Sequence, residues 1–156
     1  MNIWDKLSKT PAYCSFHDDS LVALNVTEEY IHFRTSSSSF TYCAYEEEFC
    51  GVFNNCEENN LFIDFVFLNP EISEISEFPT SIKFNEHYSI YSVSQTSDNT
   101  LSLSFWNDYE LDDFFRLDFT YEKCIVKPYG EMPTEHYYGH PELFDKPFCL
   151  GEFLEK

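Results

Sequence analysis

Two stretches of strict alternation limit what this chain can fold into more than any other feature of its sequence. Apolar side chains occupy every second position of residues 101–105 and again of residues 115–121. Successive side chains of a β-strand point to opposite faces, so each stretch predicts a strand with one buried face. The polar residues 107–113 between them predict a hairpin turn.

Shorter segments extend the same pattern. Residues 20–26 and 30–34 alternate on either side of Thr27-Glu28-Glu29, which predicts another hairpin. Leu61 to Leu68 is almost continuously apolar and is interrupted only by Asp64, as expected for a strand covered on both faces. Residues 81–93 add one bent strand or two short ones. We therefore expect a mainly β fold, either an antiparallel β-sandwich or a strongly curved sheet of about seven to eight strands.

The two ends of the chain predict different structures. Residues 3–7 group their apolar side chains on one side of a short N-terminal helix, which Pro11 would stop. Four of the seven prolines follow Val126, so residues 127–156 are expected to form an extended Pro-rich tail packed on the body. The length of 156 residues and the absence of repeats predict a single domain over residues 1–156.

Charge and composition exclude several classes of function. The chain has 28 acidic and 9 basic residues, a formal net charge of −19, which argues strongly against a nucleic-acid binder. Hydrophobic residues make up 43% and aromatic residues 19%, enough apolar material for a core rather than a disordered chain. With only 4 glycines, a Gly-rich phosphate-binding fold is disfavoured.

The sequence also bears on compartment. Residues 1–9 lack the continuous apolar segment of a secretory signal, and the longest apolar stretch is far shorter than the roughly 20 residues that span a bilayer. We expect a cytoplasmic protein that does not enter membranes. Six cysteines without a C-x-x-C spacing then predict reduced, mostly buried thiols. A zinc site that uses Cys50, Cys56 and a distant histidine is the less favoured alternative, since the spacing of the two cysteines matches no standard ligand pair.

Two histidine motifs are candidates for chemistry. His17-Asp18-Asp19 has the residue types of a general base oriented by a carboxylate, or of a metal corner, but a turn before the first strand is favoured. His136 and His140 are four residues apart, a spacing that on a helix would face one metal ion. The intervening glycine and the following proline disfavour that helix.

Two further chemical readings are weaker. Residues 107–113 place oxygen ligands at alternate positions, as in a calcium loop, yet they lack its central glycine and closing glutamate. A nucleophilic cysteine needs neighbouring positive charge, which this chain scarcely has. The sequence indicates no enzyme and no cofactor.

The surplus of acidic residues is best explained by a binding partner. Like charges destabilise a compact chain, and a net charge of about −2 to −8 already suffices for solubility. Carboxylates interleaved with aromatic residues suit a cationic protein surface, because charge speeds association and buried rings slow dissociation. The residues predicted to contact that partner are Tyr45, Glu46, Glu47, Glu48, Asp108, Tyr109, Glu110, Asp112 and Asp113.

The opening of the chain resembles that of a known family. Trp4, residues 15–26 with His17-Asp18 before an alternating strand, and Tyr30-Ile-His-Phe33 are similar to the start of small bacterial immunity proteins, most of all the immunity protein 50 group of polymorphic-toxin systems. The pair Leu101 to Phe105 and Phe115 to Phe119 also fits such proteins. His17 and Asp18 are the motif positions, and the resemblance assigns them no chemical role.

The resemblance implies a non-enzymatic protein that binds and neutralises a cognate basic toxin domain, which is expected to be a nuclease. Two alternatives stay open. One is a metal-dependent hydrolase that uses His17, Asp18, His136 and His140, and the other is a nucleic-acid mimic that inhibits a DNA-binding protein. The sequence also leaves a homo-oligomer open.

Overall fold

The computed structural model describes residues 20–37, 59–75, 81–82, 88–97, 99–107, 114–133 and 148–155. These residues form nine strands and one short helix. The elements are β1 (Ser20–Val26), β2 (Tyr30–Ser37), β3 (Asn59–Leu68), β4 (Glu71–Ile75), β5 (Ser81–Ile82), β6 (Tyr88–Ser97), β7 (Thr100–Asn107), β8 (Phe114–Thr120), β9 (Lys123–Pro133) and α4 (Leu150–Glu155).

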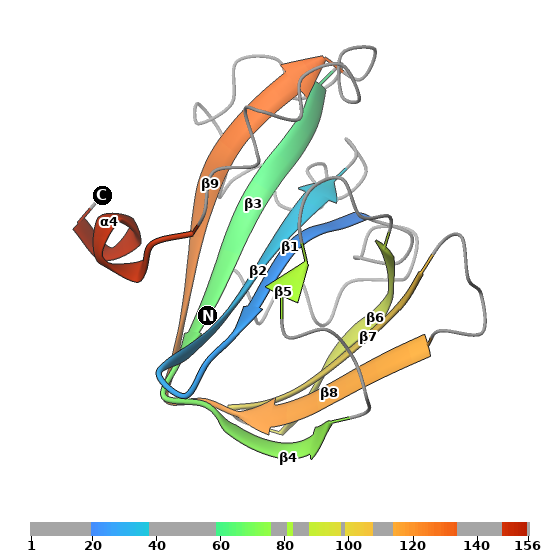
Figure 1. Cartoon of the computed structure of the whole chain (residues 1–156), viewed down its shortest axis with the longest axis vertical. Helices are drawn as coiled ribbons and strands as arrows, with labels where there is room; N and C mark the ends of the chain where they lie inside the picture. Colours follow the sequence, from blue (N-terminus) through green and yellow to red (C-terminus); the bar gives the residue numbers. More distant parts are fainter. Residues whose placement is uncertain are drawn as a thin grey trace.

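All nine strands belong to one antiparallel sheet. Its order is β4-β8-β7-β6-β1-β2-β3-β9, and the two-residue strand β5 pairs with β1 outside this path. Figure 1 shows that the sheet is strongly curved, so that β1, β2, β3 and β9 form one wing and β4, β6, β7 and β8 form the other. Between the wings, β1 and β6 are paired over a short stretch, through Ser20 with Ser89 and Leu21 with Tyr88.

A bend in two neighbouring strands carries the chain from one wing to the other. β3 continues into β4 through Asn69, whose φ of 50° lies in the left-handed region that asparagine tolerates better than most residues. β8 continues into β9 beside it, and the backbone N–H of Glu122 donates to the carbonyl of Leu68 across the bend. The Asn69 side chain also donates to the Glu122 carboxylate, at 2.6 Å. These contacts join the two bent strands at the point where the wings meet.

The hydrophobic core lies between the inner faces of the two wings. Phe67 of β3 meets Phe119 of β8 edge to face, with ring centroids 5.1 Å apart, so the wings contact each other directly. The buried core residues are Leu21, Leu24, Ile31, Phe33, Ile63, Phe65, Phe67, Ile90, Leu101, Leu103, Phe105, Leu117, Phe119 and Tyr121. They fall at alternate strand positions, except in β1, where a bulge between Leu21 and Ala23 brings both Leu21 and Leu24 inward.

The structure confirms the mainly β fold and several of its predicted parts. β1 and β2 form the predicted hairpin, β7 and β8 pair as expected, and every residue of β3 from Phe62 to Phe67 is buried. The described strands number nine rather than seven or eight. No helix in the described part of the chain is long and apolar enough to cross a membrane.

The prediction for the C-terminal end was wrong in part. Residues 127–133 are not tail but part of β9, which pairs with β3 along its whole length, and residues 150–155 are helical. Pro128 and Pro133 fit because β9 is the last strand of the sheet path, and an edge strand does not need every N–H. The predicted N-terminal helix lies outside the described residues.

Candidate functional site

The most concentrated polar group in the described part of the chain lies on the outer face of the β1–β2–β3–β9 wing. Because Ile31, Phe33, Ile63 and Phe65 face the core, the alternation turns His32, Arg34 and Asp64 to the opposite face. Arg34 lies directly across from Asp64 in the β2–β3 register, whereas His32 is its diagonal neighbour. Such positions allow side chains on one face to touch.

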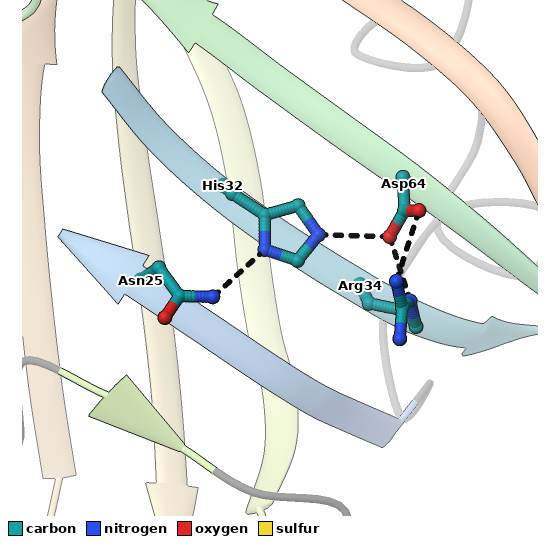
Figure 2. Close-up of polar contacts among 4 residues, drawn as sticks. All are labelled: Asn25, His32, Arg34 and Asp64. Atoms are coloured by element: carbon teal, nitrogen blue, oxygen red, sulfur yellow. Dashed lines mark hydrogen bonds and ion pairs between the residues drawn. The ribbon is translucent and has the colours of Figure 1, made fainter. Parts of the chain in front are cut away.

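These side chains form a continuous hydrogen-bonded network with Asn25 of β1 (Figure 2). Arg34 donates from Nε to Asp64 Oδ1 at 2.7 Å and from Nη2 to Oδ2 at 3.1 Å, a two-pronged ion pair. His32 Nε2 lies 2.8 Å from the same Oδ1, and the Asn25 amide lies 3.0 Å from His32 Nδ1. The network assigns the ring proton to Nε2, so that His32 donates to Asp64 and accepts from Asn25.

Burial and pairing set the charge of each group. Burial lowers the pKa of His32 below its ordinary value of 6.5, and the nearby Arg34 charge acts in the same direction, against the opposing influence of Asp64. Burial is also the largest single influence on Asp64, and it raises the pKa. The hydrogen bonds from His32 and Arg34 outweigh it together, and the net pKa is lowered. At neutral pH the network therefore contains a carboxylate, a guanidinium and an uncharged imidazole.

Side chains from the C-terminal part of the chain cover this network. The Phe148 ring stacks on His32, with centroids 3.7 Å apart and planes 8° from parallel. The Tyr129 ring of β9 lies 3.4 Å from the guanidinium carbon of Arg34. Tyr129 can reach it because the β3–β9 register shifts between Phe62 and Ile63, leaving Tyr129 as the extra residue of a bulge.

A second contact holds helix α4 against the same face. Lys127 is paired with Asp64 in the β3–β9 register, and its ammonium group donates to the carbonyl of Phe153. The same ammonium lies 4.7 Å from the centre of the Phe153 ring, which also contacts Phe148. The segment 148–155 is thus attached by a stacked ring at one end and a charged hydrogen bond at the other.

This geometry suits structure rather than catalysis. His32 is fully buried, and Arg34 and Asp64 are 3% and 4% exposed. Both nitrogens of the imidazole already have partners, so neither is open to a substrate. Within the described ranges, no three His, Cys, Asp or Glu side chains are grouped so that they could hold a metal ion. The network joins three strands and provides the base on which the C-terminal segment packs.

The residues singled out from the sequence are not part of this network. All of the predicted site residues lie outside the described residues. They are His17, Asp18, Tyr45, Glu46, Glu47, Glu48, Cys50, Cys56, Asp108, Tyr109, Glu110, Asp112, Asp113, His136 and His140. Of the cysteines that the structure describes, Cys124 is half-buried and Cys149 is exposed, and both are free thiols. The exposure of Cys149 departs from the expectation of buried cysteines.

Sequence reasoning missed His32, Arg34 and Asp64 as a group. A signal was present, because Asp64 is the one charged residue inside the otherwise apolar stretch from Leu61 to Leu68. A lone carboxylate in a strand covered on both faces requires a buried cationic or hydrogen-bonding partner. His32 and Arg34, at alternate positions of a neighbouring predicted strand, were the available candidates.

Comparison with known proteins adds no relative to this description. No protein-family model matches the chain, and neither a curated protein nor a solved structure is significantly similar to it.

Proposed function

We propose that this chain is a non-enzymatic acidic protein that binds and neutralises a cationic protein domain, in the manner of an immunity protein against a basic toxin. The observation that carries the proposal is the net charge of −19 on 156 residues, well beyond what solubility of a small domain needs. A surface of one sign attracts a partner of the opposite sign and accelerates its approach.

The use made of the cationic side chains supports this proposal. Arg34 is buried in its ion pair with Asp64, and Lys127 is engaged with Phe153. Arg116 is more exposed but pairs with Asp118 at 3.0 Å. Three of the nine basic residues of the chain are therefore occupied within the fold, and the charge offered to a partner is more uniformly negative than composition alone indicates.

The buried network also supports a binding role over a catalytic one. An acid–base residue must reach the proton that it transfers, and His32 lies beneath Phe148 with both of its ring nitrogens engaged. His32 and Asp64 thus stabilise the fold, and we assign partner binding to residues on the surface.

The test is direct binding to a basic toxin domain, sought among the proteins that the neighbouring genes encode. Titration calorimetry at 50 mM salt should give a tight complex, and raising the salt to 200 mM should weaken it, because salt screens exposed charges. Co-expression should also protect cells from that toxin domain. Absence of binding at 50 mM salt would end the proposal.

A pair of triple charge reversals tests the predicted contact residues. Reversing Glu46, Glu47 and Glu48 to lysine changes the net charge by +6, and so does reversing Glu28, Glu29 and Glu71. We expect the first variant to slow association markedly and the second to slow it much less, as measured by stopped-flow kinetics. Equal slowing would mean that only the net charge matters, and no slowing in either would make the charge a solubility device.

A further inference from the structure

The outer face of the other wing carries an aromatic cluster made of the exposed Tyr91 and Phe114 and the half-buried Trp106. The rings of Tyr91 and Trp106 are 5.3 Å apart, and those of Tyr91 and Phe114 are 5.6 Å apart. Tyr91 and Phe114 are each 47% exposed, although aromatic side chains of this size usually contribute to the core. The three residues come from three adjacent strands, β6, β7 and β8.

The backbone directs these rings away from the core. Phe105 and Phe115 pack against the core, so their neighbours Trp106 and Phe114, which are paired in the β7–β8 register, point outward. Tyr91 is the extra residue of a bulge, since Ile90 pairs with Phe105 and Ser92 pairs with Ser104. A bulge re-aims a side chain, and here it brings a third ring beside the other two.

Charge identifies the kind of partner that this cluster fits. The sequence that joins Trp106 to Phe114 supplies Asp108, Glu110, Asp112 and Asp113 and no basic residue. Arg116 lies on the same face, and its charge is balanced by Asp118. Aromatic faces attract guanidinium and ammonium groups, and a strongly negative chain adds to the attraction of such groups.

We infer that the Tyr91–Trp106–Phe114 cluster is the surface on which arginine or lysine side chains of the cationic partner are anchored. This inference rests on the proposed function and adds to it the place where the partner is held after charge has attracted it. A second copy of this chain is the poorer occupant, because two molecules of charge −19 repel each other.

The experiment uses deca-arginine as the probe and compares variants of equal net charge. In a Trp4→Phe background, the fluorescence of Trp106 should change as the peptide binds. The double variant Tyr91→Ala/Phe114→Ala should weaken binding about tenfold at fixed salt, as expected for the loss of two cation–π contacts. Phe114→Tyr, which keeps a ring, should bind like the parent chain.

A control on the other wing separates the cluster from apolar surface in general. Leu154 of α4 is 48% exposed, so Leu154→Ala removes a comparably exposed apolar side chain and should leave the affinity unchanged. Equal binding by the parent and by the double variant, with both folded by circular dichroism, would overturn the inference and leave the proposed function standing. Failure of the parent chain to bind either deca-arginine or the toxin domain at 50 mM salt would overturn both.

Light scattering tests the alternative occupant. We expect the chain to remain monomeric at concentrations up to those of the binding experiment. A dimer that Tyr91→Ala/Phe114→Ala dissociates would assign the cluster to self-association and contradict the inference.

Discussion

In a sheet with one buried face, the outward face usually carries exposed polar side chains. The outer faces of the two wings depart from this rule in opposite ways. On the β1–β2–β3–β9 wing, an outward face that alternation would leave to solvent instead buries His32, Arg34 and Asp64. On the wing that contains β6, β7 and β8, the outward face exposes Tyr91 and Phe114. The first face hides polar groups, whereas the second displays apolar ones.

The difference separates the residues that stabilise the fold from those that are available for binding. Buried polar groups are tolerated only when their hydrogen bonds are satisfied, and Asp64 meets this condition with two donors from β2, His32 and Arg34. Exposed rings contribute less to folding because they remain largely in contact with water. Mutations on the first face should therefore change the free energy of unfolding, and mutations on the second should change affinity.

The largest expected effect is that of Asp64→Ala. The substitution leaves the Arg34 guanidinium buried without its counter-charge and His32 without an acceptor, so we expect a loss of about 3–5 kcal/mol in the free energy of unfolding. Urea denaturation followed by circular dichroism measures it.

The matched control is Asp118→Ala, which breaks an ion pair of the same residue types. The Arg116 side chain is 53% exposed, so solvent screens the pair, and its loss should cost less than about 1 kcal/mol. Similar losses in the two variants would contradict the structural role assigned to the buried network.

The next largest effect should follow Phe148→Ala. The substitution removes the ring that stacks on His32 and contacts Phe153, and we expect it to lower the free energy of unfolding by about 1–2 kcal/mol. Water would then reach His32, so its pKa should rise toward 6.5, which an NMR titration of the imidazole detects. Leu154→Ala, in the same segment but exposed, should change neither quantity.

A smaller effect should appear as a pH dependence of stability. Because the pKa of folded His32 lies below 6.5, the unfolded chain binds this proton first, and stability falls as the pH drops below about 6.5, by at most about 1.4 kcal/mol per unit. The pKa of Asp64 is lowered from 3.8, so its contribution is present above pH 3.8 and is lost only below it.

His32→Gln isolates that contribution from those of the other four histidines. Glutamine can donate to Asp64 and accept from Asn25 without titrating, so the variant should lose less stability than the parent between pH 7 and pH 5. Parallel stability curves for the two chains over this range would show that His32 does not titrate on unfolding.

The strands were predictable because their signal is local. Alternation in residues 101–105 and 115–121 requires one buried face, and the structure pairs these segments as β7 and β8. The C-terminal end failed for the opposite reason. Proline marks a segment that donates fewer hydrogen bonds, and no local signal reveals that residues 127–133 form the last strand of the sheet path, where that loss is tolerated.

The buried network shows a further limit of sequence reasoning. The buried position of Asp64 predicts that it has a partner. Its partners, however, lie 30 and 32 residues away along the chain, and only the β2–β3 register decides which side chains contact it. The role of Phe148 is even harder to predict from the sequence, because its stacking on His32 depends on how the C-terminal segment returns to the sheet. Bulges such as that at Tyr91 also break the alternation on which the sequence prediction relies.

A small effect on stability is expected for Tyr91→Ala/Phe114→Ala, and this small effect makes the comparison between the wings decisive. Both rings are about half exposed, so their removal should lower the free energy of unfolding by no more than about 1 kcal/mol. Thermal denaturation of the double variant beside Phe148→Ala measures the difference. A loss as large as that caused by Asp64→Ala would place these rings among the structural supports of the sheet. A small loss in stability together with a tenfold loss of affinity for deca-arginine means that the rings are kept at the surface for a partner.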